Sequence, residues 1–189
     1  YTNITFVDIA GLVKGASKGE GLGNKFLSHI REVDAIIHLV RCFESDKITH
    51  VNSKVNPIDD LETIKTEIIL SDIDIIQKKL EKGKKKLLDE KAIKILEENL
   101  EQLNQGKEVN VGNDEDGKFL SSLGLLSIKP KIIVCNVDEE NLSKGNFFTE
   151  DVKKHHSNEK VITICADIED QIMGLDNNER ETFMKEIGL

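Results

Sequence analysis

No stretch of the sequence approaches the roughly 18 to 20 consecutive apolar residues that a bilayer-spanning helix needs. The first residues also lack the basic, then apolar, then small-residue pattern of a secretory leader. The net charge is -9, from 26 Lys and Arg residues against 35 Asp and Glu residues, so the surface as a whole does not favour nucleic acid. We therefore expect a soluble cytoplasmic protein without a membrane partner, in which any contact with nucleic acid needs a local basic patch.

Cysteine is scarce, and its spacing excludes two kinds of stabilising site. The three cysteines are Cys42, Cys135 and Cys165, an odd number without any C-x-x-C pair, and each lies in an apolar run. This pattern disfavours both a disulfide framework and a zinc site. Reduced thiols in the core are the expected alternative.

Continuous apolar runs predict the fold class. Residues 35–40, 131–135 and 161–165 have the character of buried parallel strands, and helical stretches, the first over 24–33, separate them. The frame is therefore expected to be α/β. Residues 4–9 form a further β-rich run, which predicts that the chain begins inside a core strand.

The pattern between the first and second of these strands is helical. A helix is expected to start at residues 57–60, where acids follow a proline, and to break at residues 83–86. A second helix has apolar residues spaced by three and four, as in a coiled-coil seam, and Gly106 closes it. These features predict an antiparallel helical hairpin that projects from the sheet domain, with residues 106–117 leading back to the core.

Asp8-Ile9-Ala10-Gly11 matches the D-x-x-G pattern of P-loop GTPase-like proteins. In such proteins the carboxylate holds Mg²⁺, usually through a water, and the glycine N–H meets the γ-phosphate. Alone the pattern is weak, because an ordinary strand end could also produce it. Residues 11–27 then carry five glycines, enough for a loop that changes shape around a phosphate. No G-x-x-x-x-G-K-[ST] phosphate-binding loop occurs anywhere in the chain.

The run from Phe6 to Arg41 resembles the switch region of the YchF/Obg-like ATPase family, through residues 8–13, 19–24 and 30–31. The resemblance extends over essentially the whole chain. It implies a P-loop NTPase sheet domain with an inserted coiled-coil hairpin, in a fragment that lacks the P-loop segment and the C-terminal TGS domain. The expected parts are residues 1–56 and 118–189 for the nucleotide-binding domain and 57–117 for the hairpin with its connection.

The resemblance assigns the base-recognition residues. Asn136-Val137-Asp138-Glu139 follows a core strand and resembles the family's N-x-x-E motif, which stands where GTPases have N-K-x-D. The aspartate of N-K-x-D accepts hydrogen bonds from guanine N1 and N2, so its replacement weakens the preference for guanine. The alternative for Asn136 is an ordinary turn residue. Ala166 matches a small residue whose N–H supports the base, a weaker assignment because small residues are common at strand ends.

Leu12 occupies the position where Ras-like enzymes carry the glutamine that orients the attacking water. The resemblance gives this role to a loop histidine that matches His50, for which an exposed histidine without a role is the alternative. His38 is expected to be a hydrogen-bonded core residue, while His155 and His156 are expected at an exposed helix end.

Taken together, the resemblance implies an ATP-binding and ATP-hydrolysing protein that associates with ribosomes and acts as a monomer. Mg²⁺ would accompany ATP, with potassium as a further candidate ion. The implied site comprises Asp8, Gly11, Asn136, Val137, Glu139 and Ala166 for nucleotide, Asp8 also for the metal, and His50 for catalysis.

Two questions of function stay open at this stage. A lysine-rich end of the hairpin could contact rRNA or a ribosomal protein, or could simply be a solvated tip; its members are Lys78, Lys79, Lys82, Lys84, Lys85 and Lys86. The protein could also be a nucleotide-gated binding module with negligible hydrolysis, or a GTPase. The fragment alone is expected to be inactive.

Overall fold

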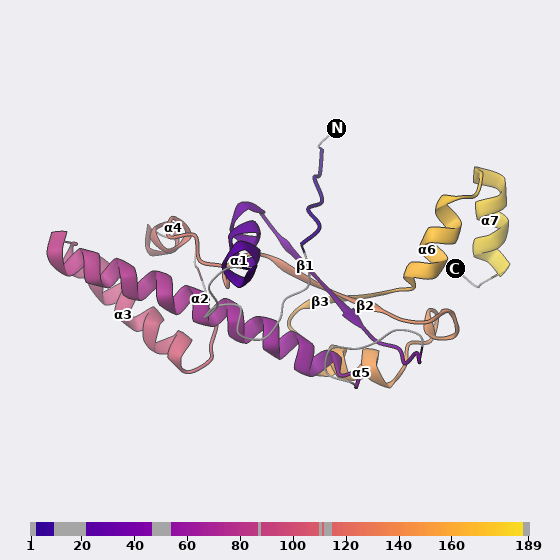
Figure 1. The fold of residues 1–189 in the computed structure, drawn as a ribbon, viewed down its shortest axis with the longest axis horizontal. Helices are drawn as coiled ribbons and strands as arrows, with labels where there is room; N and C mark the ends of the chain where they lie inside the picture. The colour runs from indigo at the N-terminus through magenta and orange to yellow at the C-terminus, as the bar shows by residue number, and fades with distance from the viewer. Residues whose placement is uncertain are drawn as a thin grey trace. The chain divides into compact units, whose positions relative to one another are not determined.

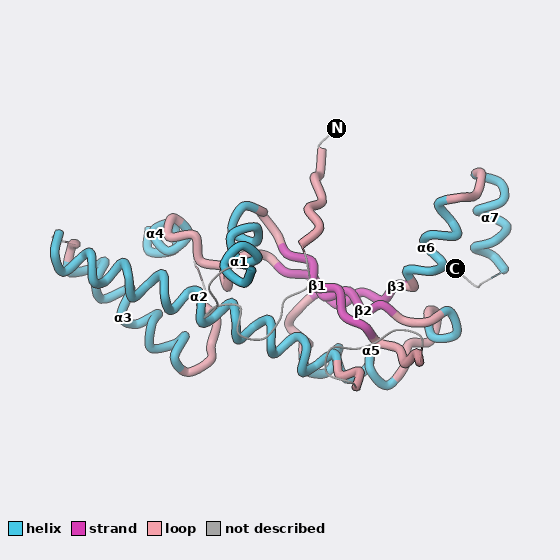
Figure 2. The backbone as a smooth tube through the Cα atoms, viewed as in Figure 1, coloured by secondary structure: helices cyan, strands magenta, loops and turns pink. Residues whose placement is uncertain are grey.

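The computed structural model describes residues 3–9, 22–46, 54–86, 88–109, 111 and 115–186. Its sheet has the strand order β1 (Ile36–Arg41), β2 (Lys131–Asn136) and β3 (Lys160–Ile164), which lie side by side in Figure 2. Strands β2 and β3 pair in parallel. Two backbone bonds join β1 to β2, from Ile36 N–H to Pro130 O and from Cys42 N–H to Asn136 O. Between these bonds the residue number rises by the same amount in both strands, so β1 is also parallel to β2. The predicted α/β fold with a parallel sheet is confirmed.

The chain divides into two compact units, whose elements are labelled in Figure 1. The first comprises Tyr1–Ile36 and Glu62–Pro130, and the second comprises Ile37–Leu61 and Lys131–Leu189. The first contains α1 (Leu22–Glu32), most of α2 (Pro57–Lys86), α3 (Glu90–Asn104) and α4 (Glu115–Ser121). The second contains nearly all of the sheet, the short helix η1 (Glu139–Asn141), α5 (Phe147–His155), α6 (Ala166–Met173) and α7 (Asn177–Glu186).

The core of the second unit lies on one face of the sheet. Strand residues there pack with residues of α5, α6 and the start of α2; the buried members are Val40, Cys42, Leu61, Ile133, Cys135, Val137, Val152, Cys165 and Ile168. The cysteines are buried and unpaired, as predicted. A hydrogen bond with Cys135, together with burial, raises the pKa of the Cys42 thiol, so that thiol stays protonated.

On the opposite face of the sheet, several strand residues are exposed, although the sequence predicts buried strands. Ile37 and Leu39 of β1 are 52% and 61% exposed, and Ile162 of β3 is 40% exposed. Successive side chains of a strand point to opposite faces, so these residues share the face away from the core. An apolar run predicts a strand but does not show which of its faces is covered.

In the first unit, a buried acid and two basic side chains tie helices to loops and to one another. Asp72 of α2 is fully buried and accepts bonds of 2.8 Å from the N–H groups of Leu126 and Ser127. Arg31 of α1 donates to the hydroxyl of Ser71 at 2.7 Å. Lys129 donates to the backbone oxygens of Arg31 and Val33, which satisfies carbonyls at the end of α1.

Helices α2 and α3 share an apolar cluster, with Ile76 and Leu80 of α2 against Leu96 and Leu103 of α3. The helix start at Pro57 and the end before Gly106 agree with the prediction, and Gly106 has a φ of 74°. The predicted break at residues 83–86 is wrong, because α2 continues to Lys86. Gly83 is buried there, and a Cβ on it would stand 2.1 Å from Cδ1 of Leu88, so close packing explains this glycine.

Residues 3–9 do not form the strand that their sequence predicts. Ile4, Phe6 and Val7 are 77%, 77% and 51% exposed, and the segment lies outside the three-stranded sheet. A strand needs a neighbour to pair its backbone groups, and the described residues provide none for this segment.

Among the described helices, none has the length and apolar character needed to cross a membrane.

Candidate functional site

The carboxyl ends of β2 and β3 hold the residues of the predicted base-recognition motif. Asn136 is the last residue of β2, and the N–H of Val137 bonds to the oxygen of Ile164, the last residue of β3, at 2.8 Å. Because parallel strands end at the same edge, the loops after both strands lie together. Ligands of open α/β sheets bind at this edge.

The side chain of Asn136 is held by the start of α6. Its Oδ1 accepts a hydrogen bond of 2.9 Å from the N–H of Ala166. This N–H belongs to the first turn of a helix and has no partner inside it, so the amide oxygen satisfies it. Within the described part of the chain, Nδ2 of Asn136 has no hydrogen-bond partner and can donate to a ligand.

A pocket of about 490 Å³ opens beside Asn136. Its lining combines one aromatic ring with the residues after the two strands: Phe43, Asn136, Val137, Asp138, Glu139, Glu140 and Asp167. All four residues of the sequence motif, 136–139, are among this lining. The side chain of Val137 is only 2% exposed and packs in the core, so little of it can reach a bound molecule.

Four carboxylates line the pocket, and two of them have amide partners. The Oδ1 of Asp138 accepts from Nδ2 of Asn141 at 2.5 Å, and Oε1 of Glu139 accepts from Nε2 of Gln171 at 3.2 Å. A wall of this charge repels free phosphate and suits the donor groups of a ligand. The pocket is therefore suited to a ligand that offers hydrogen-bond donors rather than to phosphate.

Phe43 gives the pocket a flat apolar wall. The guanidinium of Arg41 lies 4.8 Å from the centre of its ring, and Nε of Arg41 donates to the backbone oxygen of Phe43 at 2.9 Å. Such a ring can stack on any base. Motif matching did not assign roles to Phe43 or Gln171, because their contacts with the site depend on how distant segments pack.

The structure does not bring all predicted residues into this pocket. Ala166 does not line the pocket, and its N–H bonds to Oδ1 of Asn136; its expected contact with a base stays a prediction. Asp8 belongs to the first unit, is exposed, and has no partner among the described residues. Gly11 and His50 lie outside the described residues.

The other histidines differ in part from expectation. His38 is mostly buried, and its Nε2 has no hydrogen-bond partner in the described structure, although a bonded core residue was expected. Burial, followed by the charge of Lys131, lowers its pKa to about 4. His155 is exposed as predicted, whereas the side chain of His156 is only 11% exposed and lies 3.4 Å from Glu159.

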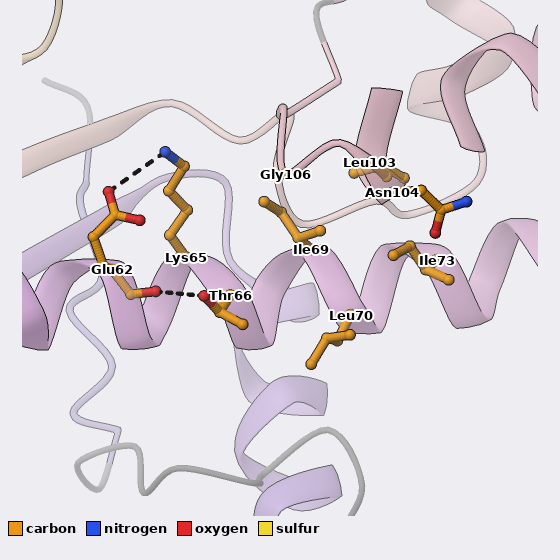
Figure 3. Close-up of a pocket in the computed structure, with 9 residues that line it drawn as sticks. All are labelled: Glu62, Lys65, Thr66, Ile69, Leu70, Ile73, Leu103, Asn104 and Gly106. Atoms are coloured by element: carbon orange, nitrogen blue, oxygen red, sulfur yellow. Dashed lines mark hydrogen bonds and ion pairs between the residues drawn. The ribbon is translucent and has the colours of Figure 1, made fainter. Parts of the chain in front are cut away.

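A second pocket, of about 330 Å³, lies in the first unit between α2 and the end of α3 (Figure 3). Ile69, Ile73 and Leu103 give it an apolar floor, and Lys65 forms an ion pair of 3.6 Å with Glu62 at one end. No group suited to catalysis lies among its lining residues, so it is not a candidate active site.

Comparison with known proteins identifies the family. A family model described as 50S ribosome-binding GTPase matches residues 1–72. The chain is 42% identical over 200 residues to "Ribosome-binding ATPase YchF" of Bacillus subtilis (strain 168), covering 100% of this chain and 54% of that protein. It is 44% identical over 202 residues to the protein of the same name from Mycoplasma pneumoniae, covering 100% and 55%.

A solved structure agrees with these relatives. "Structure of the Schizosaccharomyces pombe YchF GTPase" superposes with a TM-score of 0.79 at 30% identity, over 94% of this chain and 52% of that one. The chain thus spans about half the length of the relatives it matches. Their names differ on the nucleotide, since two are called ATPases and one a GTPase. Together with the parallel sheet, these matches show that the chain belongs to the YchF family.

Proposed function

We propose that the whole protein binds and hydrolyses ATP and associates with ribosomes in the cytoplasm. The observation that carries this proposal is the bond from Ala166 N–H to Asn136 Oδ1 beside the acidic pocket. Because this bond uses Oδ1 of Asn136, the Nδ2 group is left to donate a hydrogen bond, and an acceptor nitrogen of a purine can receive it. Phe43 supplies a surface on which the purine can stack.

Glu139 supports a preference for ATP over GTP. Guanine presents two donors, N1–H and the N2 amine, to the aspartate of a guanine reader, whereas adenine has an acceptor at N1. Glu139 is longer than that aspartate by one methylene and is already bonded to Gln171. If the protein is instead a GTPase, the Glu139 carboxylate must accept hydrogen bonds from guanine in place of, or in addition to, the bond from Gln171.

The phosphates and the water are assigned to residues outside the pocket. Asp8 would hold Mg²⁺, which supplies positive charge to the phosphates, and the N–H of Gly11 would contact the γ-phosphate. His50 would hold the attacking water in place of the glutamine that Leu12 replaces. The chain as given has no P-loop motif, so we expect it to bind nucleotide weakly and to lack turnover by itself.

The helical segment is proposed as the ribosome contact. Residues 57–117 would form a hairpin insertion between two parts, 1–56 and 118–189, of the nucleotide-binding domain. Lys82 is exposed near the end of α2, while Lys78 is exposed but forms an ion pair of 2.6 Å with Asp74. An exposed lysine at such an end favours contact with a phosphate backbone. The names of the relatives also contain the term ribosome-binding.

A second candidate function is a nucleotide-gated binding module with negligible hydrolysis, which Leu12 favours by removing the usual catalytic glutamine. Turnover measured on the whole protein with and without ribosomes distinguishes the two functions. ATP hydrolysis by the protein alone or with ribosomes supports the enzyme, and none in either condition supports the module.

Calorimetric titration of Mg-ATP into the whole protein tests the base site. Asn136→Ala should weaken ATP binding by about 10-fold, since it removes one hydrogen bond to the base and the anchor of Ala166. Asn158→Ala is the matched control, because Asn158 is exposed away from the motif. Equal affinities for wild type and Asn136→Ala would remove Asn136 from the nucleotide site.

A further inference from the structure

Gln171 makes one side-chain contact that no motif assigns to it. Its Nε2 donates a hydrogen bond of 3.2 Å to Oε1 of Glu139, from α6 to η1 across 32 residues of sequence. Glu139 lines the pocket and Gln171 stands behind it, outside the lining residues. The contact thus acts on the position of Glu139 rather than on a ligand directly.

Both ends of this contact lie on elements that are anchored within the second unit. The start of α6 is tied to Asn136 through the N–H of Ala166 at 2.9 Å, and Ile168 on the same helix is 3% exposed in the core. Glu139 begins η1, whose preceding residue Asp138 is bonded to Asn141. The two exposed side chains therefore meet from elements that are fixed relative to each other within one unit.

The chemistry of the two purines makes this contact selective. A carboxylate that reads guanine accepts from N1–H with one oxygen and from the N2 amine with the other. Gln171 already occupies one oxygen of Glu139, so bidentate acceptance from guanine would require that bond to be shared or broken. Adenine has no donor at N1 and no amine at C2, and leaves the contact undisturbed.

We propose that Gln171 is a positioning residue that disfavours guanine by holding Oε1 of Glu139. This inference rests on the proposed function, because it assumes that the pocket receives the base of a nucleotide. It predicts that removing the amide donor improves guanine binding while adenine binding stays the same.

The test uses calorimetric titrations of Mg-ADP and Mg-GDP into the whole protein. Gln171→Met keeps the length of the side chain and removes its donor. We expect the affinity for GDP to rise about 3- to 10-fold, the scale of one net hydrogen bond, with the affinity for ADP unchanged. Asp170→Asn, a neighbouring exposed residue of α6, is the matched control and should change neither affinity.

A double-mutant cycle with Glu139→Gln identifies the acceptor. In the Glu139→Gln background, Gln171→Met should no longer raise the affinity for GDP. A gain that persists there would assign the effect to another carboxylate and overturn the proposal. If ADP binds and Gln171→Met leaves the ratio of the two affinities unchanged, the inference alone fails. If neither nucleotide binds the wild type, the proposed function and this inference are both overturned.

Discussion

The side-chain amide of Asn146 donates a hydrogen bond of 2.6 Å to the backbone oxygen of Cys42, 104 residues earlier in the sequence. The same side chain caps α5, since its Oδ1 accepts from the N–H of Thr149 at 3.1 Å. One residue thus joins the start of a helix to the end of β1, next to Phe43 in the pocket wall.

Asn146→Asp separates these two roles. The carboxylate can still cap α5, but it cannot donate to Cys42 and would face that oxygen with a negative charge. We expect a loss of about 1–3 kcal/mol in the free energy of unfolding, measured by urea denaturation followed by circular dichroism. Asn158→Asp, at an exposed position, is the control and should change stability by less than about 0.5 kcal/mol. Equal stability of the two variants would contradict this account of Asn146.

Asp72 should be similarly sensitive to a near-isosteric change. Both of its oxygens accept backbone N–H bonds in a fully buried position, so Asp72→Asn would place an amide NH₂ against one of those donors. We expect a loss of about 1–3 kcal/mol in unfolding free energy. Asp74→Asn, which removes only an exposed ion pair with Lys78, should cost less than about 1 kcal/mol. A smaller effect at position 72 than at 74 would be inconsistent with the anchoring role.

His38 should make stability depend on pH. Its folded pKa of about 4 lies below the ordinary value of 6.5, so between these values the unfolded chain binds a proton that the folded chain does not. Stability contributed by the neutral imidazole is complete above about pH 6.5 and is lost as the pH falls toward 4, by about 3 kcal/mol at most.

Urea denaturation at pH 7, 6 and 5 measures this loss of unfolding free energy. His38→Gln should lose less stability than wild type over that range, while His155→Gln, at an exposed position of α5, should follow wild type. If the unfolding free energy of wild type and of His38→Gln changed equally with pH, His38 would not be the source of the pH dependence.

If His50 orients the attacking water, His50→Ala in the whole protein should lower ATP turnover by roughly 10- to 10⁴-fold. ATP affinity should hardly change, because a residue that touches only the water contributes to the transition state and not to ground-state binding. Steady-state turnover and calorimetric affinity measure the two effects. Unchanged turnover would assign the water to another group, such as backbone of residues 15–23.

What the sequence predicted correctly depended on local patterns. The apolar runs located all three strands of the described sheet. Asn136 and Glu139 line a pocket, and their contact with a base stays a prediction. What it missed depended on contacts between distant segments. The sequence predicts a helix break at Gly83 because local propensity disfavours glycine, yet α2 continues through it to Lys86, and Leu88 leaves no room for a Cβ there. The contact of Gln171 with Glu139 has no sequence signature for the same reason.

The preference for adenine at the acidic pocket is the central claim, and calorimetric titration of Mg-ATP and Mg-GTP into the whole protein tests it most directly. Glu139, bonded to Gln171 where guanine readers have a free aspartate, predicts that ATP binds more tightly than GTP. The same measurement on Glu139→Asp should still favour ATP, since Val137 also departs from the N-K-x-D pattern. GTP binding to the wild type as tightly as ATP, or more tightly, would contradict the account.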